Sequence, residues 1–243
     1  MHAYANGIIQ KIERCIKTQE DKLKSSAEFL AESVQKGGVL HVFGSGHSHM
    51  IAEEIFYRAG GPLFVNPILD PGLMLHNGAK KSTRLERIPG YAEAILESIT
   101  FNSHDVFLII SNSGRNIAPI EAVNYVNSKN LLTISISSFA HSQSVNSRHK
   151  SGKKLYDLTD ISLDNCGDIG DAQLKRDGIK EKYGATSTIM GMVLVQTWIS
   201  MTIEILVENN ITPPLIRSAN LDESDKSNND LMQKYADKIP LLK

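Results

Sequence analysis

Three polar side chains, Ser111, Asn112 and Ser113, follow a run of five apolar residues and precede Gly114 and a stretch with helical character. Free backbone N–H groups and the positive end of a helix dipole favour an anion at the start of a helix. Gly114 lets the backbone approach that anion closely, because glycine adopts conformations that other residues avoid. The stretch from Val106 to Val126 therefore predicts a phosphate site built from hydroxyls, amides and backbone N–H groups.

A second small-residue loop, Gly44 to Ser48, also follows an apolar run and precedes a helical stretch. It lacks the nucleotide fingerprint, because His49 stands where G-x-G-x-x-G requires its third glycine, and no Gly-Lys-Ser/Thr follows. Two hydroxyl-rich loops suit a compact phosphate monoester instead. The alternative is that these serines only cap helices, as Ser and Asn often do. For a single loop we would favour capping, but the paired occurrence favours a phosphate site.

Apolar runs and helical stretches alternate along the chain and position both loops. Val106 to Ile110 shows no polar alternation, which is typical of a strand covered on both faces of a parallel sheet. Because no hairpin signal joins the strands, right-handed crossovers predict an α/β fold, a three-layer sandwich with a five-stranded parallel sheet. A flavodoxin-like strand order would place the first and third strands side by side, with both loops in one crevice. Strands are predicted at 39–43, 63–66, 106–110, 131–137 and 160–163, and the main helices at 3–35, 49–59, 91–100 and 185–208.

The chain is expected to divide into an N-terminal helical segment (1–36), an α/β domain (37–210) and a C-terminal tail (211–243) with one weak helix near 230–237. The first helix is expected to pack on its own domain or on a second subunit. Two long connections, at 67–90 and 164–184, show no clear periodicity, and such loops are usually functional or mobile. The apolar helix at 185–208 is interrupted by Gln196 and other polar residues, which favours a buried or subunit-interface helix over a membrane span.

Composition narrows the class of protein. The 243 residues are 41% hydrophobic and 22% charged, as in a globular protein with a sizeable core. A formal net charge of -1 provides no bulk field for nucleic acid or for an anionic membrane. Cys15 and Cys166 are too few and too far apart in sequence for a disulfide framework or a thiolate zinc site. We see no signal peptide pattern at the start, so the expected location is cytoplasmic.

Over most of its length the chain resembles the sugar isomerase (SIS) domain, a phosphosugar-binding module of flavodoxin-like topology. The resemblance rests on two motifs: a strand, the loop GSGHS and a helix, followed later by a strand, the loop SNSGRN and a helix. Four further segments resemble a stand-alone bacterial group of SIS proteins (UPF0309-like), sometimes labelled phosphoheptose isomerases. These segments are SRHKSGKKLYD, DNCGDIGDA, GATSTIMG and PPLIRSANLD. The resemblance implies phosphate contacts from the two loops, sugar contacts from the start of the 185–208 helix, and homodimers or homotetramers with sites near subunit contacts. The predicted substrate-binding residues are Ser45, His47, Ser48, Ser111, Asn112, Ser113, Gly114, Asn116, Thr186 and Ser187.

Aldose–ketose isomerisation needs a carboxylate or histidine that moves a proton between neighbouring carbons. Glu53 and Glu54 are adjacent on the helix after the first loop, so at most one is expected to face the site. A glutamate on this helix can be the base in related SIS isomerases, although its spacing from Ser48 is shorter here than in phosphoheptose isomerases. His76 is the imidazole candidate, in a loop where arabinose phosphate isomerases have a functional histidine; a solvated loop histidine is the alternative. Gln196 stands where phosphoheptose isomerases have a histidine.

The sequence therefore favours a phosphosugar isomerase, or a related lyase or deaminase. The alternatives are a non-catalytic phosphosugar sensor that signals through a partner, and a sugar-phosphate etherase, which would require two suitably placed glutamates. No helix-turn-helix segment is apparent, and the balanced charge argues against direct binding to DNA. No cofactor is predicted, and no metal site, since His141, His149, Asp164, Asp168 and Asp171 lack compact ligand spacing.

Overall fold

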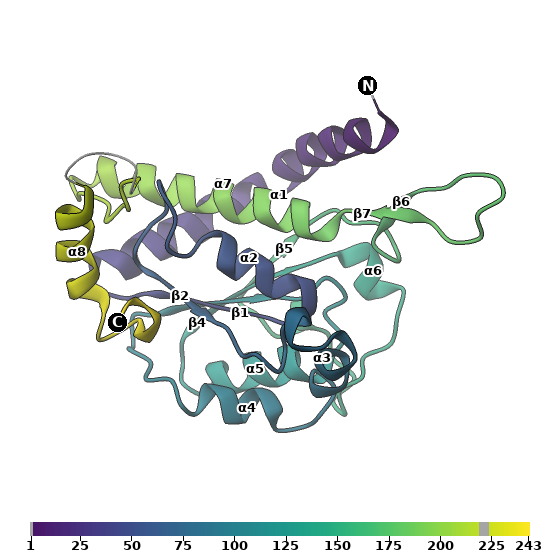
Figure 1. The fold of residues 1–243 in the computed structure, drawn as a ribbon, viewed down its shortest axis with the longest axis horizontal. Coiled ribbons are helices and arrows are strands. Elements are labelled where there is room, and N and C mark those ends of the chain that lie inside the picture. The colour runs from purple at the N-terminus through teal and green to yellow at the C-terminus, as the bar shows by residue number, and fades with distance from the viewer. Residues whose placement is uncertain (1, 219–223) are drawn as a thin grey trace.

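The computed structural model describes residues 2–218 and 224–243 and contains a five-stranded parallel sheet (Figure 1). The strand order is β2-β1-β3-β4-β5, so the first and third strands are neighbours, with Leu40 opposite Val106 and Gly44 opposite Ile110. This arrangement confirms the predicted flavodoxin-like order. It places both small-residue loops at the end of the sheet where the carboxyl ends of the strands lie. The strands are β1 (Leu40–Gly44), β2 (Val65–Ile68), β3 (Val106–Ile110), β4 (Leu132–Ser137) and β5 (Ile161–Asp164).

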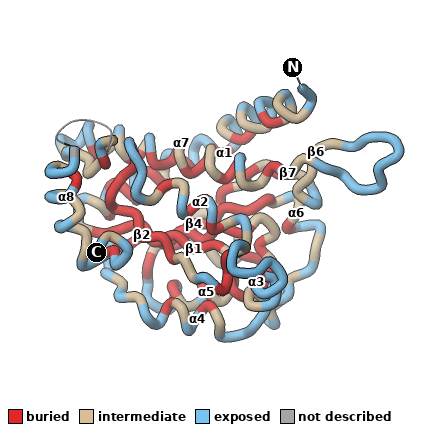
Figure 2. Tube along the Cα trace, in the orientation of Figure 1, coloured by how far each residue is buried: buried red, intermediate tan, exposed pale blue. Residues whose placement is uncertain are grey.

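Helices cover both faces of the sheet, which confirms the predicted three-layer α/β sandwich (Figure 1). Along β3 the side chains alternate: Val106, Leu108 and Ile110 enter one core cluster, and Phe107 and Ile109 enter the other. Burial on both faces accounts for the continuous apolar run of this strand. Figure 2 shows buried residues along the central strands, whereas the edge strand β5 is mostly half-buried. One face carries α1 (Ala3–Gln35), α2 (His49–Glu54) and α7 (Ser187–Glu208), and the other carries α4 (Tyr91–Leu96) and α5 (Ile117–Asn127).

The long helices α1 and α7 pack against each other above the sheet. Leu23 and Leu30 of α1 share a buried cluster with Trp198 of α7, so α1 contributes to the same core as the sheet. By length and composition α7 could cross a membrane, and 44% of its most apolar window is buried within the chain. It lies beside α1 and shares one buried cluster with α1 and the strands, which is the position of a core helix.

Two connections contain more regular structure than the sequence predicted. The segment at 67–90 contains a 3-10 turn, η2 (Leu75–Asn77), and a short helix, α3 (Ala79–Leu85). This helix is fixed by a tertiary contact, since Ser82 Oγ donates to Leu73 O at 2.8 Å, and it is too short to show periodicity. The segment at 164–184 contains an antiparallel hairpin, β6 (Ala172–Leu174) with β7 (Tyr183–Ala185). Its strands are short and its loop is long, so it carries no tight-turn signature.

Other boundaries also differ from the prediction. The helix predicted at 49–59 ends at Glu54. Three residues later Tyr57 has a left-handed φ of 46°, a conformation that is incompatible with a right-handed helix. The weak helix predicted near 230–237 is α8 (Ser224–Tyr235). The end of the PPLIRSANLD motif, at 219–222, lies outside the described residues. The remaining short elements are η1 (Gly46–Ser48), α6 (Phe139–Gln143), η3 (Leu155–Asp157) and η4 (Pro240–Leu242).

Candidate functional site

Segments that are distant in sequence converge on a small cavity at the carboxyl ends of the central strands. The cavity is bordered by loops after β1, β3 and β5 and by the start of α7, the position where open parallel sheets bind ligands. Its volume is about 10 Å³, roughly that of one water molecule, and its polar side chains are of the types that hydrogen-bond to hydroxyls. The lining residues are Ser48, Ile51, Ile110, Asn112, Ile136, Asn165, Ser187 and Thr188.

The loop from Ser111 to Asn116 folds back on itself ahead of α5. The backbone N–H of Gly114 donates to Ser111 O at 3.1 Å and lies 3.2 Å from Ser111 Oγ. Gly114 has a φ of 57°, and a Cβ there would lie 3.2 Å from Ser142 Oγ. Glycine therefore suits both the backbone conformation and the close packing. Within the part of the chain that the structure describes, Ser113 makes no hydrogen bond, so its hydroxyl is available to a ligand.

Positive charge collects beside this loop. Arg148 donates from its guanidinium to Asn116 Oδ1 at 2.6 Å and from its backbone N–H to Arg115 O at 2.8 Å. Burial, with the nearby charges of Arg87 and Arg115, lowers the pKa of Arg148, and Glu86 partly offsets this effect. Because these cations repel one another, a bound anion would be stabilised here.

A buried lysine adds to the same cluster. Lys154 donates from Nζ to the carbonyl oxygens of Ser142 and Val145. Burial and the neighbouring Arg115 lower its pKa. Hydrogen bonds thus hold the exposed Arg148 and the buried Lys154 to segments beside the 111–116 loop.

The residues after β1 lie at different depths. Ser48 lines the cavity, whereas Ser45 Oγ donates to Glu86 Oε2 at 3.0 Å. His47 is exposed, while the neighbouring His49 is buried with its Nδ1 against Gly46 O. Neither histidine lines the cavity, although His47 is among the predicted substrate-binding residues.

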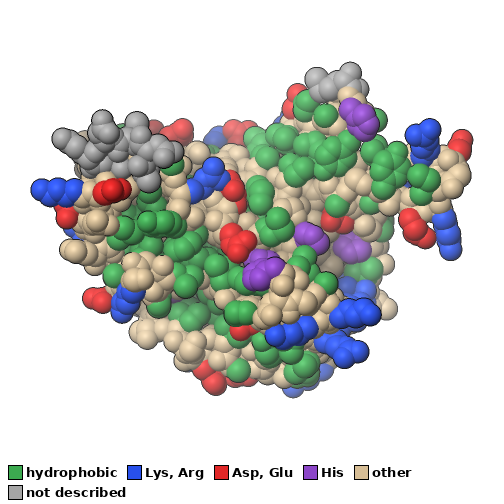
Figure 3. Space-filling model, in the orientation of Figure 1, with side chains coloured by type: hydrophobic (Ala, Val, Ile, Leu, Met, Phe, Trp, Pro, Cys, Tyr) green, Lys and Arg blue, Asp and Glu red, His purple; other side chains and the backbone are tan. Residues whose placement is uncertain are grey.

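The candidate histidine His76 is exposed in η2, and its ring lies 6.3 Å from the ring of His49. It does not line the cavity. In Figure 3 histidine side chains gather close to acidic side chains near the middle of the molecular face, over α2 and the segment that leads to α3. The walls of the cavity themselves come from neutral residues.

The two adjacent glutamates of α2 point in different directions. Glu54 Oε1 accepts from Gln196 Nε2 at 3.3 Å, across to α7, and pairs with Arg58. Glu53 has a side chain that is 46% exposed and lies 3.7 Å from His49 Nε2. Glu54 follows the cavity residue Ile51 by three positions, so the two share one face of the helix.

Two site residues were missed from the sequence. Asn165 is 2% exposed, and its Nδ2 donates to Asn112 Oδ1 at 3.0 Å. Asp171 caps α7, because its carboxylate accepts from the backbone N–H groups and hydroxyls of Thr186 and Ser187 at 2.6–3.3 Å. Both belong to the DNCGDIGDA segment, which was noted as a motif without a role. Among the described residues, no group of three or more His, Cys, Asp or Glu side chains could hold a metal ion.

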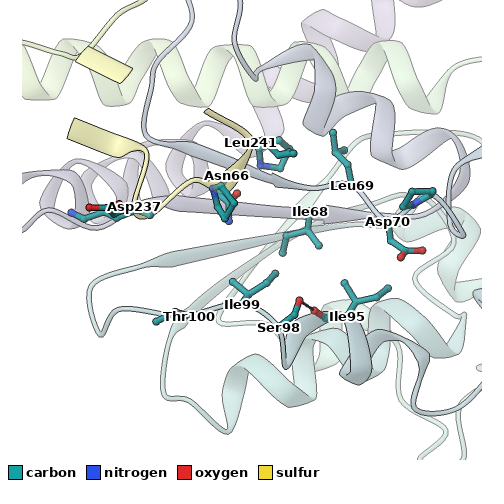
Figure 4. Close-up of a pocket in the computed structure, with 14 residues that line it drawn as sticks. Asn66, Ile68, Leu69, Asp70, Ile95, Ser98, Ile99, Thr100, Asp237 and Leu241 are labelled. Carbon is teal, nitrogen blue, oxygen red and sulfur yellow. Dashed lines mark hydrogen bonds between the residues drawn. The ribbon is translucent and has the colours of Figure 1, made fainter. Parts of the chain in front are cut away.

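A larger cavity, of about 510 Å³, lies along the edge strand β2 between α4 and η4 (Figure 4). Asn66, Ile68, Ile99 and Leu241 are among its walls, and none of the predicted site residues lines it. Phe64 O accepts from Leu40 N–H, so alternate residues of β2 face β1, and Pro67 lies on the outward side. This larger cavity lies beside the outer strand β2 and is separate from the small cavity lined by Ser48 and Asn112.

Comparison with known proteins agrees with this architecture. A family model described as the SIS domain matches residues 3–138. A UPF0309 protein of Listeria innocua is 41% identical over 239 residues, covering 98% of this chain and 97% of that protein. A UPF0309 protein of Halalkalibacterium halodurans is 43% identical over 234 residues, covering 96% and 95%.

Two solved structures share the fold at low sequence identity. A phosphoheptose isomerase from Francisella tularensis matches with a TM-score of 0.56 at 17% identity, covering 83% of this chain and 95% of that one. A phosphoheptose isomerase from Neisseria gonorrhoeae matches with a TM-score of 0.52 at 14% identity, covering 83% and 96%. Sequence match, relatives of nearly equal length and shared fold lead to one conclusion: the chain belongs to the SIS domain family.

Proposed function

We propose that the protein binds a phosphorylated sugar at the carboxyl ends of β1, β3 and β5. The observation that carries this proposal is the cavity that joins Ser48, Asn112, Asn165 and the start of α7 next to the 111–116 loop. The phosphate would lie ahead of α5, where the helix dipole, the Ser113 hydroxyl and the nearby arginines favour an anion. The sugar hydroxyls would face the amides and hydroxyls of the cavity. Phosphoheptose isomerases of the same fold support this ligand class.

We further propose that the bound sugar phosphate undergoes aldose–ketose isomerisation with Glu54 as the base. Glu54 lies one helical turn beyond Ile51, on the face of α2 that borders the cavity, whereas Glu53 is more exposed. His76 remains the imidazole candidate for opening the ring, beside His49.

A non-catalytic phosphosugar sensor is the second candidate. It is favoured by Gln196, because the amide that contacts Glu54 cannot transfer protons in the way a histidine does. A sensor would keep the phosphate loop and the cavity while lacking the acid–base pair. Ligand binding and proton transfer therefore need separate tests.

Sugar phosphates are expected to raise the melting temperature of the protein, and the corresponding free sugars are not. At a ligand concentration of about 100 times Kd the stabilisation would be about 2.7 kcal/mol. A Ser111→Ala, Ser113→Ala double variant should lose this shift, because it removes both hydroxyls of the loop. Differential scanning fluorimetry of both proteins measures the effect.

The matched control is Ser128→Ala, which removes an exposed serine hydroxyl at the opposite end of α5. This variant should respond to sugar phosphates as the unmodified protein does. A full shift in the double variant would show that the phosphate is held elsewhere.

We also propose that the protein is a cytoplasmic homodimer or homotetramer. Both cysteines are free thiols, as expected in a reducing compartment. Ile9 of α1, Met50 of α2 and Ile189 of α7 are exposed apolar side chains on the helices that cover one face of the sheet. A second copy packed on these helices would bury them.

Light scattering during size-exclusion chromatography is expected to give a mass of two or four chains. Ile189→Glu should shift the protein towards the monomer, because it places a charge at the proposed contact. Ile88→Glu changes an exposed isoleucine after α3 and should leave the mass unchanged. A monomeric mass for the unmodified protein at high concentration would contradict this assembly.

A further inference from the structure

Two cysteines that are far apart in sequence meet at a single carbonyl oxygen. Cys15 Sγ, on α1, donates to Asp164 O at 3.2 Å, and Cys166 Sγ lies 3.9 Å from the same oxygen. Thr18 Oγ1, one turn along α1, lies 3.8 Å from Cys166 Sγ. Their separation in sequence argued against a disulfide framework. In the fold, however, β5 runs beside α1 and brings both thiols close to the same carbonyl oxygen.

The two thiols differ in reactivity. Cys15 is fully buried in the core between α1 and the sheet, whereas Cys166 is half-buried and can be reached from solvent. The adjacent Cys15 thiol lowers the pKa of Cys166 to about 7. The adjacent Cys166 sulfur, together with burial, raises the pKa of Cys15. At neutral pH the thiolate therefore forms on the accessible sulfur, which is the arrangement of an attacking and a resolving cysteine.

Cys166 also belongs to the tight loop that carries Asn165 into the cavity. It adopts a φ of 54°, in the left-handed region that residues other than glycine rarely occupy. The loop is held by Asp164 Oδ1, which accepts the Cys166 N–H at 3.0 Å, and by Ser138 Oγ, which donates to Gly167 O at 2.7 Å. A displacement of Cys166 would be passed directly to Asn165.

We propose that Cys15 and Cys166 are a peroxide-sensitive dithiol whose oxidation to a disulfide pulls Asn165 away from Asn112. The Cys166 thiolate attacks an oxygen of hydrogen peroxide, the O–O bond breaks, and a sulfenic acid and hydroxide form; the hydroxide takes a proton and leaves as water. The Cys15 sulfur then attacks the sulfenic sulfur, the S–O bond breaks, and a second water leaves. Two thiols lose two electrons and two protons, and the peroxide is reduced to two waters.

Formation of the disulfide is tested on the full chain by treatment with hydrogen peroxide, alkylation of the remaining thiols and intact-mass measurement. The unmodified protein should lose both alkylation sites and two hydrogens, remain a single chain on a non-reducing gel, and recover both thiols with dithiothreitol. Cys166→Ser and Cys15→Ser should form no internal disulfide, and Cys15→Ser should trap a sulfenic acid on Cys166.

Two retained thiols, or a sulfinic acid on Cys166 without a disulfide, would overturn the proposal. Because Cys15 is in the core, Cys15→Ala provides a second variant, and melting curves show which variants fold.

Displacement of Asn165 is measured by hydrogen exchange of the 164–167 amides in the reduced and oxidised protein. Exchange is expected to rise on oxidation, since Asn165 N–H donates to Ser137 O and Gly167 N–H to Asn165 Oδ1 in the reduced form. Equal exchange in both forms would overturn the coupling between the dithiol and the cavity. This readout needs no ligand.

An effect on affinity rests on the proposed function. Fructose 6-phosphate, the probe used here, should bind the oxidised form about tenfold more weakly, as expected from the loss of a buried hydrogen bond. A probe that binds neither form would count against the proposed ligand class, while the exchange measurement still decides the displacement of Asn165. If both forms bind the probe with equal affinity while hydrogen exchange rises on oxidation, the disulfide changes the 164–167 loop but does not control ligand binding. That result would overturn the proposed effect on affinity.

Discussion

The Glu54→Gln variant is expected to lose a factor of about 10² to 10⁴ in the rate of isomerisation, the usual contribution of a general acid–base group. Glutamine keeps the size of the side chain and its contact with Gln196, but it cannot take a proton from the sugar carbon. The measurement is conversion of a sugar phosphate in deuterated water, with deuterium incorporation at the carbon next to the carbonyl.

The neighbouring Glu53→Gln variant is the matched control. The Glu53 side chain is more exposed and lies against His49 on another side of α2, so its loss should change the rate by no more than about twofold, as for most surface substitutions. Equal losses in both variants would remove Glu54 as the base. If sugar phosphates raise the melting temperature of the unmodified protein without conversion or exchange, the sensor function is correct and the isomerase function is wrong.

The Asp105→Asn variant is expected to lose about 3–5 kcal/mol of unfolding free energy, as when one partner of a buried charged network is removed. Asp105 is 4% exposed, and its carboxylate accepts from Val39 N–H at 2.9 Å, Asn102 N–H at 2.7 Å and His41 Nε2 at 2.9 Å. An asparagine would turn an NH₂ group towards at least one of these donors and leave it unsatisfied. Urea denaturation measures the change.

Asp160→Asn is a matched control, because Asp160 also precedes a strand and accepts a backbone N–H, from Thr133 at 2.8 Å, but is exposed. The Asp160 carboxylate also accepts from Thr133 Oγ1 at 2.8 Å, so its loss should cost about 1–2 kcal/mol, the value of two ordinary hydrogen bonds. If the two variants lose similar amounts of unfolding free energy, burial of the Asp105 network contributes nothing beyond ordinary hydrogen bonds.

The same residue predicts how stability depends on pH. Burial alone would raise the pKa of Asp105, but hydrogen bonds from His41, Asn102 and Val39 outweigh it and lower the pKa below its ordinary value of 3.8. The carboxylate therefore contributes stability that is present above pH 3.8 and is lost as the pH falls through the lower, folded-state pKa. The decline of unfolding free energy in acid should be smaller in Asp105→Asn than in the unmodified protein.

The parallel sheet was predictable because its strands follow from local patterns, and the strand order was expected from the resemblance to a flavodoxin-like family. Uninterrupted apolar runs such as Val106 to Ile110 indicate strands buried on both faces, and the helical stretches between them require parallel crossovers. The two loops were also visible, since their small polar residues come directly after strand ends. The hairpin β6–β7 was not, because its three-residue strands depend on packing beside α1, where Gln173 Nε2 donates to Tyr4 O at 3.0 Å.

The missing parts of the candidate site share a physical reason. Asn165 and Asp171 act through partners that are distant in sequence, and neither belongs to a periodic element. Asp171 reaches fifteen residues ahead to cap α7 at Thr186, and Asn165 contacts Asn112 across β4, the strand between β3 and β5. Cys15 and Cys166 follow the same rule, since only the placement of α1 beside β5 makes them neighbours. Local spacing cannot report such contacts.

The two outer strands of the sheet each carry a feature that opposes pairing with a strand of another chain. An open edge can recruit a strand from another chain and start an ordered aggregate. Pro67 offers no N–H on the outward side of β2, and at the other edge Lys22 Nζ donates to Ser162 O of β5 at 2.8 Å. A blocked donor at one edge and a tethered charge at the other discourage edge-to-edge growth. Contact between copies of this chain through the edges of the sheet is therefore disfavoured.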